Sequence, residues 1–215
     1  MKYLLLLLTT LTATAADPVA LYNGKDLSGW TTIDGKPMAA GWVVEKDSVL
    51  HRATKGGDLY TAKEYADFEF SFEWKIGPGG NSGVKYRIFP YDKKGPIGPE
   101  YQLLDDAKHK DALVGPQRQT ASLYDFTGPD AALKKLNPPG EWNSSKVVAR
   151  GSKLEHWLNG VKVLEMDTST PAWKTALGKS KFKDVPTFAQ NPKGRIMLQD
   201  HGDETWFRNL TIREL

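Results

Sequence analysis

The alternation of large apolar and polar residues over positions 67–76 constrains the fold of this chain more than any other feature. Five apolar side chains alternate there with four polar ones: Phe68, Phe70, Phe72, Trp74 and Ile76 with Glu69, Ser71, Glu73 and Lys75. Successive side chains of a strand point to opposite faces, so this segment predicts a strand with one face in a core. Its polar face then meets water, another sheet or a ligand. The Gly-Pro-Gly-Gly at 77–80 predicts the turn that ends the strand.

Short strands with similar spacing are predicted along the rest of the chain. They cover 83–89, 100–104, 121–126, 146–150, 153–158, 161–165, 195–199 and 205–213. Asn159-Gly160 predicts a tight hairpin turn, because both residues tolerate positive φ. Only 130–136 and 170–177 are typical of short helices, and no repeat or linker divides the chain. Many short strands with few helices predict a β-sandwich or barrel formed by a single domain.

The N-terminal residues are typical of a secretory signal peptide. One lysine precedes an apolar run over 4–8, and small residues follow at Ala13 and Ala15. We therefore expect residues 1–15 to be removed, and residues 16–215 to form one domain that is exported to the periplasm or the extracellular space. No other segment has the length of a membrane span, so none is expected.

Composition excludes several classes of function. The absence of cysteine excludes disulfides, thiol catalysis and thiolate metal sites. Lys and Arg number 29 against 26 Asp and Glu, and this small, evenly spread excess does not indicate a nucleic-acid partner. The zinc-protease, nucleophile-elbow, phosphate-loop and dinucleotide motifs are all missing, so no organic cofactor is expected. The oligomeric state stays open.

Polar side chains on the predicted strands are the strongest functional signal. Alternation places them in pairs on one face of their strands: Glu100 with Gln102, Gln199 with His201, and Lys85 with Arg87. Amide, carboxylate and imidazole groups near aromatic rings suit a sugar-binding surface. Sugar hydroxyls need donors and acceptors, and aromatic rings stack on the apolar face of a pyranose.

Each of these residues also has a purely structural interpretation. Glu100 is equally consistent with a surface carboxylate, and His201 with a residue of the Asp-His-Gly turn. Asp105 with its neighbour Asp106 favours a turn cap over a cation site. His156, beside the predicted hairpin, favours a structural role, and the basic loop at 179–183 favours a solvated surface.

Ordered sequence blocks give the chain a family resemblance. They are LYNGKDLSGW (21–30), DFEFSFEWK (67–75), GGNSGVKYR (79–87), PEYQLLDD (99–106), GEWN (140–143), HWLNG (156–160), GRIMLQDHG (194–202) and FRNLTIREL (207–215). With these blocks the chain resembles the 3-keto-disaccharide hydrolase family of bacteria from residue 21 to residue 215.

The resemblance implies a fold and a reaction. The fold is a concanavalin- or glucanase-like jelly-roll β-sandwich of two antiparallel sheets, all-β in class, with the site on a concave sheet. The implied substrates are glycosides whose glucose 3-OH is oxidised to a ketone, cleaved by hydrolases or 1,2-lyases, some of them metal-assisted. The C3 ketone acidifies the C2 hydrogen, so cleavage needs a base at C2, donors at the C3 oxygen and an acid at the glycosidic oxygen.

Under this resemblance we expect the blocks at 79–87, 99–106 and 194–202 to converge on one face. Glu100 and His201 are the expected base and acid, or the ligands of a divalent cation of unknown identity. The expected substrate-binding residues are Asn81, Arg87, Gln102 and Gln199, followed by Asp105 and Tyr124.

Two other functions fit the same residues. A non-catalytic carbohydrate-binding module uses the same fold and a polar face, because fold does not determine function. Hydrolysis of unmodified glycans by two carboxylates, for example Glu73 and Glu100, is the third option. The expected partner is a small sugar or oligosaccharide in every case.

Overall fold

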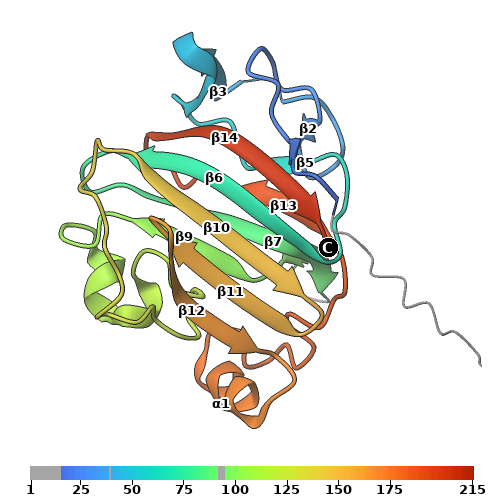
Figure 1. Cartoon of the computed structure of the whole chain (residues 1–215), viewed down its shortest axis with the longest axis vertical. Coiled ribbons are helices and arrows are strands. Elements are labelled where there is room, and N and C mark those ends of the chain that lie inside the picture. Colours follow the sequence, from blue (N-terminus) through green and yellow to red (C-terminus); the bar gives the residue numbers. More distant parts are fainter. Residues whose placement is uncertain (1–15, 39, 92–94) are drawn as a thin grey trace, which may run out of the picture.

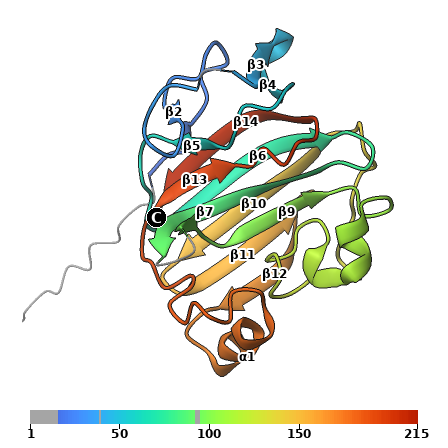
Figure 2. The same ribbon diagram turned by 180° about the vertical axis from the view of Figure 1, so that it is seen from behind.

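Two antiparallel sheets lie face to face in the computed structural model, which describes residues 16–38, 40–91 and 95–215 (Figure 1). Figure 1 looks onto the first sheet and Figure 2 onto the second. The predicted all-β sandwich of two antiparallel sheets is confirmed. The predicted signal peptide at 1–15 lies outside the described residues, so export stays a prediction.

The first sheet has the strand order β12-β11-β10-β6-β14-β4-β3, and β1 also pairs with β14. Its strands are β1 (Val19–Ala20), β3 (Trp42–Glu45), β4 (Val49–Arg52), β6 (Phe68–Ile76), β10 (Asn143–Arg150), β11 (Lys153–Leu158), β12 (Val161–Asp167) and β14 (Thr205–Glu214). The hairpin between β11 and β12 turns at Asn159 and Gly160, both with positive φ, as predicted.

The second sheet has the order β2-β5-β13-β7-β8, with β9 also paired to β7. Its strands are β2 (Trp30–Thr31), β5 (Leu59–Thr61), β7 (Asn81–Tyr91), β8 (Gly95–Ile97), β9 (Glu100–Leu104) and β13 (Arg195–Leu198). The segment predicted as a strand at 121–126 forms only isolated bridges, of which one joins Leu123 to Tyr101.

Helices are few among the described residues. The helix α1 (Pro171–Lys179) lies beside the end of β12 and confirms the prediction at 170–177 (Figure 1). Short 3-10 helices cover Lys46–Ser48, Lys110–Val114 and Pro116–Arg118. The helix predicted at 130–136 is wrong, because that segment forms a turn held by the carbonyl of Asp130. No helix in the described ranges has the length and apolar character to cross a membrane.

The core lies between the sheets, where β6 contributes the apolar face predicted from its alternation. Its five large apolar residues are buried, and its polar residues are partly exposed on the outer side. The ring of Phe72 packs edge-on against Tyr101 of β9, with centroids 5.7 Å apart, and so joins the two sheets. Since Tyr101 and Leu103 are buried in this core, their neighbours Glu100 and Gln102 project from the other side of the second sheet.

A loop runs along the free edge of β9. The backbone N–H of Gln102 donates to Ser122, that of Ala121 donates to Gln102, and that of Tyr124 donates to Glu100. These bonds hold residues 119–126 along the edge of the second sheet, next to the 3-10 turns (Figure 2). The loop thereby reduces the exposure of side chains that a bare edge strand would leave in solvent.

Candidate functional site

Three sequence blocks predicted to converge are neighbouring strands of the second sheet. Strand β7 lies between β9 and β13, and Lys85 is paired with Glu100 on one side and Met197 on the other. Two residues before Lys85 on β7, Gly83 pairs with Gln102. The carbonyl of Gly83 accepts a 2.9 Å bond from the N–H of Gln199. This register brings the polar residues of three distant segments onto one surface.

Gly83 forms the floor of this surface because it has no side chain. A Cβ at this position would lie 2.5 Å from Oε1 of Glu100 and 3.3 Å from Oε1 of Gln199. The carboxylate of Glu100 and the amide of Gln199 therefore lie over the backbone of Gly83. Any larger residue would displace the carboxylate.

Two lysines lie near Glu100. Nζ of Lys85 is 3.6 Å from Oε2 of Glu100, and the two side chains are 21% and 8% exposed. Lys181 lies over the ring of Tyr124, 4.3 Å from its centroid, and the backbone N–H of Tyr124 donates to the Glu100 carbonyl. Although Lys181 still reaches solvent, partial loss of hydration lowers its pKa, while the charge of Glu100 opposes this effect.

Three side-chain amides on this sheet have buried oxygens without partners. Within the described residues, Oδ1 of Asn81 and Oε1 of Gln102 and Gln199 accept no hydrogen bond. A buried polar atom without a partner costs about 1–3 kcal/mol. Natural proteins keep such atoms mainly where a ligand, an ion or a water molecule supplies the missing partner. The amides are therefore consistent with a site that receives a polar ligand.

An ion-pair network fixes the loop that borders the site. The hydroxyl of Tyr124 donates to Asp111 at 2.8 Å, and burial together with this bond raises the pKa of Tyr124. Arg118 joins the carboxylates of Asp111 and Asp125 at 2.8 and 2.9 Å. Asp125 also accepts the backbone N–H of Lys181 at 2.6 Å. These bonds fix the ring of Tyr124 and the backbone of Lys181 in the loop next to β9.

His201 is placed apart from this group. It is exposed after β13 and, with Lys55, Asp200 and Gly202, lines a separate hollow of about 400 Å³. No hydrogen bond or ion pair joins its ring to Glu100 or to another described residue. The structure therefore does not bring the predicted acid and base into contact.

Two predicted substrate-binding residues have structural partners instead. The buried guanidinium of Arg87 bonds to the carbonyls of Ala66 and Gly151 and to the carboxylate of Asp67. Its φ of 47° and a register shift between β7 and β13 break the alternation, so the prediction that Arg87 shares a face with Lys85 is wrong.

Asp105 caps a turn, which is the structural role that the sequence favours for it. Its carboxylate, 2% exposed, accepts the backbone N–H of Gly79 at 2.7 Å, of Ala107 at 3.1 Å and of Lys108 at 3.2 Å. These bonds connect the turn before β7 to the turn after β9. Asp105 is therefore a capping residue at the end of the sheet.

The predicted divalent cation stays a prediction, because the described residues show no cluster of carboxylates and imidazoles at Glu100. Within 16–38, 40–91 and 95–215 no three His, Cys, Asp or Glu side chains gather as metal ligands. The charged group nearest to Glu100 is the ammonium of Lys85, which already balances the carboxylate.

The position of Glu73 excludes the pair of Glu73 and Glu100 that is the example for the alternative with two carboxylates. Glu73 lies on the outer face of the first sheet, where Arg208 and Asn209 donate to it at 2.7 and 2.8 Å. Glu100 lies on the outer face of the second sheet. The core separates the two groups, so they cannot flank one glycosidic bond.

Two lysines at the site were not among the predicted site residues. The sequence indicates Lys85 only as a neighbour of Arg87 on the same strand. Its pairing opposite Glu100 depends on the register of β7 with β9. Lys181 belongs to the basic loop interpreted as solvated surface, and local sequence carries no signal that this loop docks on Tyr124.

Comparison with known proteins identifies the family. Residues 17–213 match the family described as "3-keto-alpha-glucoside-1,2-lyase-like domain". The chain belongs to this family. It is 34% identical to a 3-keto-disaccharide hydrolase of Bacteroides thetaiotaomicron, with 92% of the chain and 78% of that protein aligned.

Solved structures agree with this assignment. A candidate glycosyl hydrolase from Parabacteroides distasonis has a TM-score of 0.80 and 34% identity, with 92% of this chain and 94% of that one covered. A β-glucanase of Bacillus licheniformis, 10% identical, has a TM-score of 0.55 with 95% and 100% covered, and supports the jelly-roll fold alone. The family and its relatives support a glycosyl hydrolase-like function.

Proposed function

We propose that this protein cleaves glycosides whose C3 carbon is a ketone, with Glu100 as the base that removes the C2 proton. The family and the relative named as a 3-keto-disaccharide hydrolase support the substrate class. The observation that carries the assignment of the base is the position of the Glu100 carboxylate over Gly83, beside Lys85 and two amides without partners.

The proposed chemistry begins at C2. Glu100 takes the proton, and the electron pair of the C2–H bond moves onto the C3 oxygen as an enolate. Re-formation of the C3 carbonyl then makes the C1–C2 double bond and expels the C1 substituent, which takes up a proton. Addition of water to C1 completes hydrolysis, whereas release before this step gives a lyase product.

Lys85, 3.6 Å from Glu100, is proposed to stabilise the enolate. Positive groups fixed beside the developing charge lower the barrier without reorganising during the reaction. Gln102 and Gln199 are proposed to orient the sugar hydroxyls, because their amides have no partners among the described side chains.

Two residues are candidates for the proton donor to the leaving group. We favour Lys181, because it lies on Tyr124 beside Glu100 and its lowered pKa makes it a stronger acid than an ordinary lysine. His201, the donor expected from the sequence, is exposed and has no contact with Glu100. The variants Lys181→Gln and His201→Ala decide between them. Loss of the true donor should slow the cleavage of substrates with poor leaving groups much more than that of substrates with good leaving groups.

The test is turnover of a purified 3-keto-disaccharide beside the same disaccharide without the ketone. We expect cleavage of the keto-sugar alone, and a loss of about a hundredfold or more in Glu100→Gln with an unchanged circular-dichroism spectrum. Wild-type protein that binds the keto-sugar without turnover, with and without added divalent metal or chelator, would instead establish a carbohydrate-binding module. Export and processing after residue 15 are proposed from the sequence alone.

A further inference from the structure

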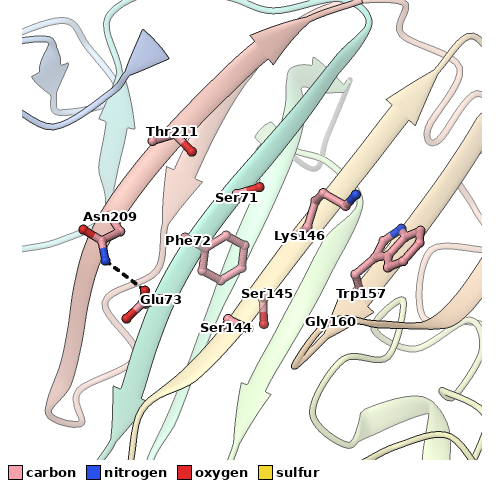
Figure 3. A pocket seen from close by; sticks show the side chains of 10 residues that line it. All are labelled: Ser71, Phe72, Glu73, Ser144, Ser145, Lys146, Trp157, Gly160, Asn209 and Thr211. Carbon is pink, nitrogen blue, oxygen red and sulfur yellow. Dashed lines mark hydrogen bonds between the residues drawn. The ribbon is translucent and has the colours of Figure 1, made fainter. Parts of the chain in front are cut away.

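A hollow lined by polar and aromatic side chains lies on the opposite side of the molecule from Glu100. It has a volume of about 440 Å³ and lies on the outer face of the first sheet (Figure 3). We call it the outer groove and define it by Ser71, Glu73, Ser144, Lys146, Trp157 and Thr211. Its volume is within the range of small-molecule sites, about 300–1,000 Å³.

Strand register builds the outer groove from one row of residues across four strands. Trp157 of β11 pairs with Lys146 of β10, which pairs with Ser71 of β6, which pairs with Thr211 of β14. Figure 3 shows these side chains on neighbouring strands. Small hydroxyl residues in the middle form a low floor, while the indole and the lysine form a high wall on one side.

The opposite wall is a carboxylate that already has partners. Glu73 accepts a bond from Arg208 at 2.7 Å. It accepts another from Asn209 at 2.8 Å, which Figure 3 shows. Partial burial favours a higher pKa of Glu73, but these bonds outweigh it and lower the pKa. Glu73 therefore stays ionised and adds little free negative charge to the groove.

The indole N–H of Trp157 donates to Glu155 at 2.8 Å, but the hydroxyls of the groove have no partners among the described residues. In the described part of the chain, no hydrogen bond is made by the hydroxyls of Ser71, Ser144 or Thr211. Nζ of Lys146 has no carboxylate within 4.0 Å and lies 4.2 Å from the ring centroid of Trp157. The groove thus offers hydroxyls without partners, an ammonium without a carboxylate partner and a partly exposed indole, which the ammonium contacts on one face.

We propose that the outer groove is a second, non-catalytic site that binds a saccharide chain. Sugar hydroxyls match a floor of serine and threonine hydroxyls, because both act as donor and acceptor. The indole supplies the apolar surface on which a pyranose ring packs, and the lysine supplies a charged donor. The site lies across the core from Glu100, so its occupation does not compete with the proposed reaction.

The test is titration of the full chain with cellotetraose, maltotetraose and tetragalacturonate, followed by calorimetry and by the indole signals in NMR spectra. We expect at least one of these saccharides to bind in the millimolar range or tighter. Trp157→Ala should weaken that binding about tenfold or more, equal to about 1.4 kcal/mol. Ser71→Arg, which fills the floor, should abolish it. Loss of affinity for tetragalacturonate alone in Lys146→Met identifies an acidic saccharide as the ligand.

Matched controls separate the groove from the proposed active site. Trp206 is another outer-face tryptophan of the same sheet, outside the groove, and Trp206→Ala should leave binding unchanged. Trp157→Ala should keep full turnover of a soluble 3-keto-disaccharide, and Glu100→Gln should keep saccharide binding at the groove. Absence of binding by all three saccharides, or binding that survives both Trp157→Ala and Ser71→Arg, would overturn the proposal.

Discussion

Oε1 of Glu100 occupies the space where a side chain at Gly83 would begin, 2.5 Å from the position of its Cβ. The Gly83→Ala variant must therefore move the carboxylate by several tenths of an ångström or more. We expect the sheet to persist and turnover of a 3-keto-disaccharide to fall about a hundredfold, because misplacement of a reacting group by about 1 Å has effects of this size. Steady-state kinetics with circular dichroism measure both outcomes.

The matched control for this variant is Gly178→Ala. Gly178 lies in α1, its φ is not positive, and no atom lies within 4 Å of its Cβ position. Alanine favours a helix over glycine by about 1 kcal/mol, so stability should rise slightly and turnover should not change. Equal turnover in Gly83→Ala and Gly178→Ala would show that the position of Glu100 has no importance for the reaction.

The lowered pKa of Lys181 predicts an alkaline limit of activity. Loss of hydration favours its neutral form, so its ammonium loses the proton at a lower pH than an ordinary lysine. We expect kcat/KM to fall with rising pH below the ordinary lysine range of about 10.4. In Lys181→Gln, which has no ammonium at this position, the remaining activity should not show this fall. An alkaline limb identical in the two proteins would remove Lys181 from the mechanism.

His156 predicts acid sensitivity of the fold. It is fully buried between the hydroxyl of Tyr86 and the carbonyl of Ala121, at 3.0 and 3.1 Å, and burial lowers its pKa from 6.5 to about 4. Because the unfolded chain binds more protons between these values, His156 contributes full stability above about pH 6.5 and loses it as pH falls to about 4.

The loss expected from His156 alone is about 3 kcal/mol across that window. Urea unfolding at about pH 7 and about pH 4.5 measures it, with His156→Gln as the comparison. The variant should be less stable at neutral pH and should lose less stability on acidification. An equal acid-induced loss in both proteins would assign the acid sensitivity to other groups.

Asp200 and His201 should differ sharply in their effect on stability. Asp200 pairs with buried Arg52 at 2.5 Å and accepts the backbone N–H groups of Gly56 and Gly57, each at 2.8 Å. Removing one partner of a buried ion pair typically costs about 3–5 kcal/mol, so Asp200→Ala should unfold at much lower urea concentration. His201→Ala, at an exposed position, should stay within about 0.5 kcal/mol of the wild type. Similar midpoints for the two variants would contradict the role of the ion pair.

Much of the fold follows from local sequence, because alternation in β6 and turn chemistry at Asn159-Gly160 agree with the tertiary structure. Convergence of the segments carrying Glu100 and Gln199 also follows from the family resemblance. Arg87 could not be placed, because a bulge with positive φ changes its direction without a glycine to mark it. Lys181 could not be found, because its docking depends on contacts with Tyr124 and Asp125, which are distant in sequence.

Removal of the C2 proton by Glu100 is tested most directly with two 3-keto-disaccharides, one with hydrogen and one with deuterium at C2. Their cleavage rates are compared in ordinary water, and exchange of the C2 hydrogen of the first is followed in deuterated water. The account predicts a primary isotope effect on the C2 hydrogen with the wild type, and loss of both proton exchange and cleavage in Glu100→Gln. Full exchange and cleavage by Glu100→Gln would contradict the account.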